Sequence, residues 1–345
     1  MTDPSITPHN TQRENAMKVT TRKGIALLAA AAALVLSACS GGAGSQAGGQ
    51  DDGEGDGATK TVETAFGEVE IPTEPTSVVA LEGAIGPLLS AGITPKATAT
   101  GDMPDGLLPE EFEQVKDLPA VLGPDGWEYE KIAAQKPDLL IGTVRAGKDE
   151  EISPQAQEEY KRLKGIAPTV LIRAEGATQA KDATLQIAEI VGSGDKAEEA
   201  KEEYEKKVDH IKTTYGDKLE EYTFAPIDHF EGNVSVYTPI SWLGGIITDI
   251  GGTLDPVSAE VTDRNGTDLS TEQLTKLSDT SIILTEMGVD GEPGAGAAEL
   301  ADVPTYQQLP AVKAGHAFGV KHFFPDRYET ANIVLDQLED ILKKV

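Results

Sequence analysis

Three arginines carry the side chains best suited to binding chemistry in this chain. Only five arginines lie beyond residue 39, and Arg145, Arg173 and Arg327 all stand at or beyond the carboxyl ends of segments predicted to be strands. A guanidinium can bind two anionic oxygens side by side and can stack on an aromatic ring. The alternative for each arginine is a surface ion pair with one of the many carboxylates. Taken together, the three positions favour a site for an anionic ligand.

Aromatic residues make up only 5% of the chain, so the places where they gather are informative. One tryptophan precedes a predicted helix, a tyrosine and a tryptophan flank residues 238–241, and three aromatic residues surround residues 325–327. Flat rings offer apolar contact to a bulky ligand and a cation–π partner to an arginine. The alternative is that one of the phenylalanines anchors the helix predicted over residues 330–343. The six residues are Trp127, Tyr237, Trp242, Phe323, Phe324 and Tyr328.

The sequence shows no catalytic motif and no set of metal ligands. His229 follows a predicted strand and His322 lies beside the aromatic residues, so either could bind a haem iron axially, although a loop histidine more often makes ordinary hydrogen bonds. No cluster of His, Cys and Asp has the spacing of a metal site. A Gly-x-Ser-x-Gly elbow, a phosphate-binding loop and a His-Glu-x-x-His motif are also missing. We therefore expect neither catalytic residues nor metal ligands, and predict that the protein is not an enzyme.

Cys39, the single cysteine, has a different chemistry. It ends the segment Leu36-Ser37-Ala38-Cys39, which closes an apolar run at residues 24–38 that follows a basic cluster. This arrangement is typical of a signal peptide and resembles a bacterial lipobox, which implies that the thiol carries a diacylglyceryl group and anchors the chain to a membrane. The alternative is a structural cysteine after a buried helix. Met17 precedes the basic cluster and is an alternative start to Met1.

The composition separates a tether from a large acidic globular part. Residues 40–60 are rich in Gly, Ser, Gln and Asp and lack apolar periodicity, which predicts a flexible tether. The net charge of the chain is −29, and it becomes −31 without residues 1–39, which hold four basic and two acidic residues. Such acidity disfavours nucleic acid as a partner. The remaining residues are more than one small core needs, so we expect two lobes or one large domain.

The elements that position these side chains follow an α/β pattern. Short β-branched runs alternate with amphipathic runs, which predicts parallel sheets covered by helices. Apolar residues from Ala197 to Tyr215 recur at spacings of three and four, and Asp195 with Glu198 resembles a capping box, so we expect one long helix over residues 195–215. It divides the globular part into an N-terminal lobe, residues 61–194, and a C-terminal lobe, residues 216–345. The expected strands are Ser77–Leu81, Lys96–Thr100, Leu139–Thr143, Thr169–Ile172, Thr223–Ile227, Ser281–Leu284 and Ala317–Val320.

The order of these segments resembles a known family, the substrate-binding lipoproteins of bacterial ABC importers for ferric siderophores, haem and cobalamin. The most specific segment is Tyr129–Ile141, in which a helix leads through Lys-Pro-Asp into a buried strand. The proline lacks an amide hydrogen and so ends the helix abruptly. The resemblance covers essentially the whole chain after the tether. Its other segments are Phe66–Pro72, Val78–Leu81, Leu88–Pro95, Leu163–Ile172 and Leu309–Phe318.

The resemblance implies a two-lobed binding protein of the periplasmic type, with parallel-sheet lobes, a long interlobe helix and a cleft that moves little on ligand binding. It places the six aromatic residues above at the ligand, and the three arginines occupy candidate positions on the loops of the same cleft. It also implies that an acidic residue on each lobe docks onto the permease. We expect Asp249 in the second lobe; in the first lobe Gly86 stands where the acid would align, and Glu82 is the nearest acid.

The prediction is therefore a lipoprotein on the extracytoplasmic face of the cell membrane. It captures a ferric siderophore or related chelate non-covalently and delivers it to an ABC importer, with no cofactor of its own. The alternative ligands are haem and cobalamin, for which His229, Tyr237 or His322 would matter more than the arginines. Alternatives from other classes are a lipoprotein hydrolase or cell-wall enzyme, and a structural or signalling lipoprotein with a degenerate cleft.

Overall fold

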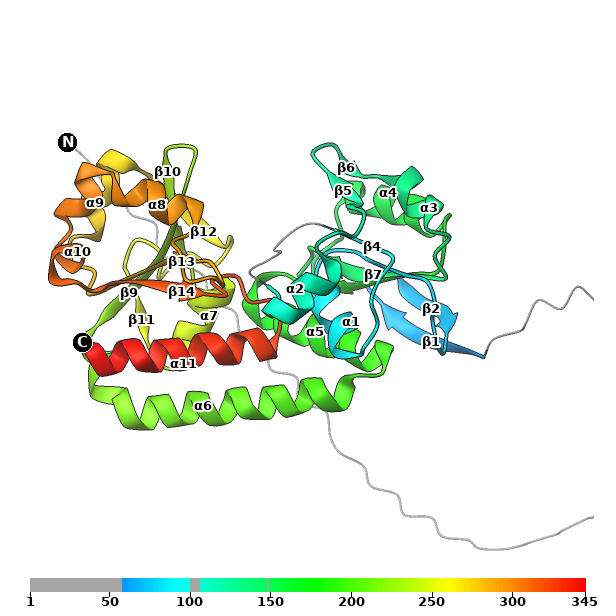
Figure 1. Ribbon diagram of the computed structural model, residues 1–345, viewed down its shortest axis with the longest axis horizontal. Helices are drawn as coiled ribbons and strands as arrows, with labels where there is room; N and C mark the ends of the chain where they lie inside the picture. Colours follow the sequence, from blue (N-terminus) through cyan, green and yellow to red (C-terminus); the bar gives the residue numbers. More distant parts are fainter. Residues whose placement is uncertain (1–57, 100–105, 148) are drawn as a thin grey trace, which may run out of the picture. The chain divides into compact units, whose positions relative to one another are not determined.

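The computed structural model describes residues 58–99, 106–147 and 149–345, which belong to one compact unit. The predicted signal peptide with Cys39 and most of the predicted tether lie outside these residues. The described part contains two α/β lobes, lobe 1 (residues 58–193) and lobe 2 (residues 222–345), and a long helix that runs beneath both (Figure 1). None of the helices in these ranges is both long enough and apolar enough to cross a membrane.

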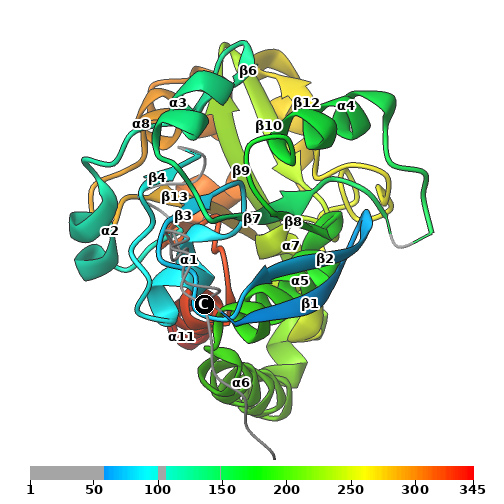
Figure 2. The same ribbon diagram turned by 90° about the vertical axis from the view of Figure 1, so that its right-hand side faces the viewer.

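Lobe 1 is built on a four-stranded parallel sheet with the order β4-β3-β7-β8. Its strands are β3 (Val78–Ala80), β4 (Ala97–Thr98), β7 (Leu139–Val144) and β8 (Thr169–Arg173). These are the four strands that the sequence predicts for this lobe. An antiparallel hairpin of β1 (Thr59–Thr64) and β2 (Gly67–Pro72), which was not predicted, lies against the β8 edge, where the Ala65 amide donates to the Leu171 carbonyl at 2.8 Å (Figure 2).

Helices cover both faces of the lobe 1 sheet. Alternate residues of β3 face two separate apolar clusters. Val79 packs in the cluster that includes helices α3 and α4, and Val78 packs in the cluster that includes helices α1 and α5. Burial on both faces is the usual condition of a parallel sheet. The small hairpin of β5 (Leu122–Gly123) and β6 (Gly126–Trp127) precedes α3. The helices are α1 (Ile85–Ser90), α2 (Pro109–Val115), α3 (Tyr129–Ala134), α4 (Pro154–Leu163) and α5 (Gly176–Val191).

The Lys-Pro-Asp segment joins α3 to β7 through a specific set of hydrogen bonds. The Asp138 carboxylate accepts from the Thr76 amide at 2.7 Å, the Thr76 hydroxyl at 2.8 Å and the Ser77 amide at 3.0 Å. Burial alone would raise the pKa of Asp138, but these hydrogen bonds outweigh it and lower the pKa. The aspartate thus fixes the start of β7 beside the start of β3, which explains why this segment marks the fold.

Lobe 2 has a mixed sheet with the order β12-β10-β9-β13-β14, and β11 pairs with β9. The three predicted strands β9, β13 and β14 are parallel, as expected, but β10 and β12 extend the sheet in antiparallel fashion. The turn from β9 to β10 consists of Glu231 and Gly232, both with positive φ, which suits a two-residue hairpin. The strands are β9 (Thr223–Phe230), β10 (Asn233–Tyr237), β11 (Thr253–Leu254), β12 (Gly266–Ser270), β13 (Ile282–Met287) and β14 (Ala317–Lys321).

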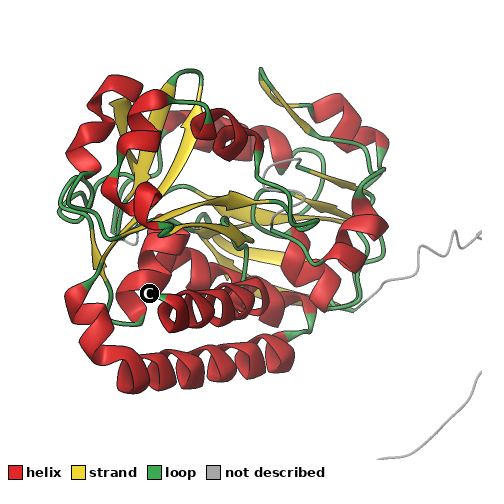
Figure 3. Ribbon diagram, turned by 60° about the vertical axis from the view of Figure 1, so that its left-hand side comes forward, coloured by secondary structure: helices red, strands yellow, loops and turns green. Residues whose placement is uncertain are grey.

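The lobe 2 sheet is also enclosed by helices on both faces (Figure 3). One apolar cluster joins it to α6, α7 and α11, and the other joins it to the 3-10 helix and the short helices α8 to α10. Ser241 caps α7 by accepting from the Gly244 amide at 3.1 Å. The helices are α7 (Trp242–Asp249), a 3-10 helix (Thr271–Leu277), α8 (Ala295–Ala301), α9 (Pro304–Gln308), α10 (Pro310–Ala314) and α11 (Tyr328–Lys344).

The interlobe helix α6 (Gly194–Glu221) is longer than the predicted 195–215. At Tyr215 the backbone leaves helical geometry (φ −120°, ψ 18°), and a further helical piece follows. The predicted apolar positions up to Ile211 are buried against α5 in lobe 1 and α11 in lobe 2, whereas Tyr215 is only half-buried. The capping box expected at Asp195 is wrong, because the N-cap residue is Ser193, whose side chain makes no capping hydrogen bond, and Asp195 lies within the first turn. Its 28 residues span about 42 Å, enough to lie along both lobes.

Candidate functional site

The loop after β8 of lobe 1 and the loop after β10 of lobe 2 meet between the lobes. Gly176 follows β8 in lobe 1 and has φ +71°, and a Cβ atom there would lie 3.2 Å from the Ile240 Cβ of lobe 2. Ile240 comes from the loop between β10 and α7. Open α/β sheets bind ligands beyond the carboxyl ends of their parallel strands, and β8 ends in this way at the junction, so we take the junction as the candidate site.

The lobe 1 side of the junction carries two of the predicted arginines. Arg145 follows β7 and is exposed, whereas Arg173 ends β8 and is half-buried. The Arg173 Nη1 donates to the carbonyl oxygens of Gly147 and Glu150, at 2.8 and 2.9 Å, and so holds the loop after β7. Arg173 also lines a pocket of about 330 Å³ between β1, β8 and α5. Arg145 therefore presents its charge to solvent, while part of the Arg173 guanidinium is used inside the protein.

Carboxylates lie close to these arginines. The pKa of Glu175 is raised, mainly by burial and then by the hydrogen bond with Glu150 and the charge of that residue. The Gly147 amide and the charge of Arg145 oppose this rise. The Glu150 carboxylate also accepts from the Gly147 amide at 3.3 Å. This edge of lobe 1 is thus a mixed-charge surface rather than a purely basic one.

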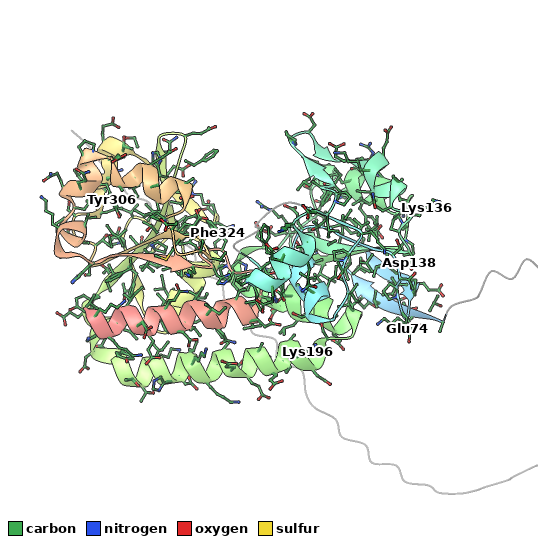
Figure 4. All side chains as sticks on the ribbon, in the orientation of Figure 1. Glu74, Lys136, Asp138, Lys196, Tyr306 and Phe324 are labelled. Atoms are coloured by element: carbon green, nitrogen blue, oxygen red, sulfur yellow. The ribbon has the colours of Figure 1, made fainter. Side chains whose placement is uncertain are left out.

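The lobe 2 side carries a cluster of three aromatic rings. The Tyr237 ring lies edge-on to the rings of Phe323 and Phe324, with centroids 5.5 and 5.4 Å apart, and the two phenylalanine rings lie 5.0 Å apart. Such edge-to-face pairs are favourable arrangements of aromatic quadrupoles. Phe323 is fully buried and anchors the cluster, whereas Tyr237 and Phe324 are half-buried. Phe324 lies on the side of lobe 2 that is turned toward lobe 1 (Figure 4).

The two tryptophans lie in different lobes. Trp127 is half-buried in β6 of lobe 1 and packs against the apolar cluster of α3 and α4. Trp242 is half-buried at the first turn of α7 in lobe 2 and packs against the larger lobe 2 cluster. Each is therefore a separate fluorescent reporter of its own lobe.

Arg327 and Tyr328 lie deeper than the sequence suggests. Arg327 is only 3% exposed, and its guanidinium lies among the carboxylates of Glu111, Asp326 and Glu329. Tyr328 is 7% exposed and its ring lies edge-on to Tyr204, with centroids 5.3 Å apart. A ligand at the junction would find the Arg327 charge already paired, and direct ligand contact by these two residues stays a prediction.

The two histidines are buried. The His229 Nδ1 lies 3.0 Å from a Glu299 carboxylate oxygen, and the side chain is 8% exposed. His322 is 4% exposed and has φ +55°. Within residues 58–99, 106–147 and 149–345, no group of three or more His, Cys, Asp or Glu side chains is arranged to hold a metal ion.

The two acids expected to meet the permease differ in their surroundings. Asp249, at the end of α7, accepts a hydrogen bond from the Tyr204 hydroxyl at 2.6 Å and pairs with Lys181 of α5. Glu82 is half-buried, and its carbonyl accepts from the Thr143 amide at 2.8 Å. Docking by either acid stays a prediction.

The contact of Asp249 with Lys181 and Tyr204 belongs to a pocket that the sequence analysis did not anticipate. The pocket measures about 540 Å³ and lies between α5, α6, α7 and the start of α11. Burial and the charge of Asp249 raise the pKa of Tyr204. A signal existed in the sequence, since Lys181 falls on the buried face of α5, in register with Thr184 and Ala188.

Comparison with known proteins agrees with this architecture. Residues 78–322 match the family described as "Periplasmic binding protein". The putative ABC transporter substrate-binding lipoprotein YhfQ of Bacillus subtilis is 26% identical over 79% of this chain and 85% of its own length. The probable siderophore-binding lipoprotein YfiY of the same organism is 29% identical over 56% of this chain and 57% of its own length.

A solved structure is similar over most of the described residues. The siderophore periplasmic binding protein from the fuscachelin gene cluster of Thermobifida fusca is 32% identical, with a TM-score of 0.70, and the match covers 80% of this chain and 99% of that protein. The fold described above is therefore shared with a siderophore periplasmic binding protein of known structure.

Proposed function

The chain belongs to the periplasmic binding protein family, and from that premise we propose that it is the substrate-binding component of an ABC importer that captures a ferric siderophore. The observation that carries the proposal is the similarity to the Thermobifida fusca siderophore-binding protein, at 32% identity across 99% of that protein. Its ligand binds non-covalently at the junction of the lobes. Iron reaches the protein already wrapped in its chelator, and the chain holds no cofactor of its own.

The geometry of the junction supports a bulky anionic chelate as the ligand. Lobe 2 offers the half-buried rings of Tyr237 and Phe324, which present flat apolar surface and are held in place by the buried Phe323. Lobe 1 offers the exposed Arg145, with Arg173 fixing the loop that carries it. Apolar rings with a few convergent charges are typical of small-molecule sites.

The relatives that are named as lipoproteins support a membrane-anchored location. The proposed anchor is the acylated Cys39, with the protein on the extracytoplasmic face of the cell membrane. The proposed partner is the importer permease, which Glu82 and Asp249 contact. Gly86 is buried and has no space for a side chain, so the acid through which lobe 1 docks lies at another position.

The alternatives receive less support. The relatives named above include a probable siderophore-binding lipoprotein and a siderophore periplasmic binding protein, which favours a ferric chelate over haem or cobalamin. The His229 Nδ1 is already engaged by Glu299, which lessens its suitability as an axial ligand. The family consists of binding proteins, and the chain accordingly acts as a receptor without turning its ligand over.

The proposal is tested by titrating tryptophan fluorescence of the full chain with ferric catecholate, ferric hydroxamate, ferric citrate, haem and cobalamin. Because Trp127 and Trp242 are the only tryptophans, variants with Trp127→Phe or Trp242→Phe report one lobe at a time. Saturable quenching in both lobes at one equivalent of a single ferric chelate is expected. Saturation by haem with a shifted Soret band, or hydrolysis of an added ester, would contradict the proposal.

The arginines offer a second test of the ligand class. Losing a hydrogen-bonded charge at the ligand costs about tenfold to a hundredfold in affinity. We expect a loss of this size for Arg145→Gln, and Arg162→Gln is the matched control because Arg162 stacks on Tyr129 inside lobe 1. Unchanged affinity in Arg145→Gln, Arg173→Gln and Arg327→Gln would exclude recognition of the anion by arginine.

A further inference from the structure

Arg327 lies at the centre of a buried cluster of charges. It stands between β14 and α11 with an extended backbone, and its side chain is 3% exposed. Both carboxylate oxygens of Glu111 lie 2.6 Å from Nη2, and the two Asp326 oxygens lie 2.8 and 3.0 Å from Nη1. A Glu329 oxygen lies 3.5 Å from Nε. One cation is therefore surrounded by three carboxylates, two of them almost as buried as the arginine.

The cluster joins the two lobes. Arg327 and Glu329 belong to lobe 2, whereas Glu111 belongs to α2 of lobe 1. The Ser90 hydroxyl of α1 adds a second crossing by donating to Glu329 at 3.0 Å. The start of α11 thus meets the α1 and α2 side of lobe 1, as Figure 1 shows.

Close packing makes this junction specific. Gly86 lies in the first turn of α1, and a Cβ atom there would lie 2.0 Å from an Asp326 oxygen and 2.5 Å from the Arg327 Nη1. Only glycine permits the lobe 2 loop to approach α1 so closely. The approach and the ion pairs therefore depend on each other.

We propose that Arg327 is a positioning residue which, with Glu111 and Glu329, fastens lobe 2 to lobe 1 and fixes the spacing of the loops that carry the binding site. The proposal holds for any ligand, so it goes beyond the proposed function. An arginine that served only lobe 2 would take its partners from lobe 2, but its closest carboxylate comes from lobe 1. A second contact between the lobes, Lys181 with Asp249, remains when Arg327 is lost, so the lobes are expected to loosen rather than to separate.

The distance between the lobes can be measured by double electron–electron resonance (DEER) spectroscopy between two spin labels. The full chain with Cys39→Ser has no other cysteine, so Ala133→Cys in α3 and Ala301→Cys in α8, both exposed, give one label on each lobe. Without ligand, the doubly labelled protein that keeps Arg327 and Glu111 should give one narrow distance distribution. Arg327→Gln and Glu111→Gln should broaden it and add a longer-distance population.

The matched control is Asp336→Asn, which removes an ion pair with Lys207 at 2.8 Å between α6 and α11 without touching lobe 1. It should leave the distribution narrow. Distributions in Arg327→Gln and Glu111→Gln that match this control would overturn the proposal. If Arg327→Gln fails to fold, Glu111→Gln and Ser90→Ala decide the outcome, because both leave the Arg327–Asp326 pair intact. Failure of the fluorescence titrations would leave this result unaffected.

Discussion

Among the residues that the structure describes, two groups of charged residues connect the lobes, and they differ in composition and burial. The first, the Arg327 bridge, contains one guanidinium and three carboxylates, and Arg327 is 3% exposed. The second, the Lys181 bridge, contains one ammonium, the Asp249 carboxylate and the Tyr204 hydroxyl, and Asp249 is 39% exposed beside an open pocket. A planar guanidinium can serve several carboxylates at once, whereas an ammonium acts as a point charge.

Burial and charge balance decide how much a bridge between the lobes contributes to stability. The Arg327 bridge carries an excess of negative charge in a site with little solvent, so losing its one cation leaves carboxylates unpaired. The Lys181 bridge is balanced, and water can replace the lost partner at the exposed end. Stability should therefore respond strongly to changes in the first bridge and weakly to changes in the second.

The largest effect is expected from Arg327→Gln. Removing one partner of a buried ion pair destabilises a protein by roughly 3 to 5 kcal/mol, because the remaining charges stay buried. Urea unfolding of the variant and of the double variant with Glu111→Gln measures this, and the double variant should recover part of the loss. A loss no larger than that of Asp336→Asn would mean that the bridge does not hold the lobes.

Gly86→Ala should reduce the free energy of unfolding by about 2 to 3 kcal/mol, as overpacking does in well-packed interiors. The new Cβ would lie 2.0 Å from the Asp326 carboxylate, so the loop before α11 must move. Gly216→Ala is the control, because a Cβ there meets nothing within 4 Å and alanine favours a helix. Equal unfolding midpoints for the two variants would contradict the close approach of the lobes.

The pH dependence of stability should reveal Asp326. Burial raises the pKa of its carboxyl to about 6, with Arg327 opposing the rise and Glu111 adding to it. The folded protein therefore binds this proton more tightly than the unfolded chain, so the contribution to stability is complete below about pH 4 and disappears as the pH rises through 6. We expect about 2 kcal/mol of this decline between pH 4.5 and 7.5.

Asp326→Asn removes this titrating group, so the difference between the two pH curves measures its contribution. The variant should lose less stability than the parent between pH 4.5 and 7.5. Parallel curves of unfolding free energy against pH for the two proteins would contradict this prediction, because they would mean that the pKa of Asp326 is not raised in the folded protein.

The smallest effect is expected from Lys181→Met. Methionine retains most of the buried aliphatic volume, and the half-exposed Asp249 can be solvated once its partner is gone, so the loss should be about 1 kcal/mol. A double-mutant cycle with Asp249→Asn gives the coupling between the two side chains. A coupling as large as that between Arg327 and Glu111 would remove the distinction between the bridges.

Much of the fold follows from local sequence patterns. All seven predicted strands are present, the buried positions of α6 lie where the apolar spacing puts them, and the final helix covers the predicted residues. The β1–β2 hairpin and the added strands of lobe 2 were not predicted. Their short alternating segments are stabilised by pairing with strand edges that exist only in the folded sheet.

The candidate site was predicted less completely. The sequence indicated Tyr237, Phe323 and Phe324 separately, and the structure brings their rings together. It also indicated Arg173 and Arg327 as groups that could bind an anion, but both make hydrogen bonds within the protein. Residue type reveals the chemistry that a side chain can perform, whereas its partners depend on the packing of distant segments.

The α/β alternation, the long helix and the resemblance to binding proteins could be inferred from the amino-acid sequence, because these depend on patterns within a few residues of each other. The way in which the lobes are joined emerges only in the folded protein. Glu111 and Arg327 lie 216 residues apart, and 58 acidic residues could each have been the partner of that arginine. Nothing local distinguishes one carboxylate from another, so the folded chain alone selects which of them meet the arginine, through the burial and close packing that bring α2 and α11 together.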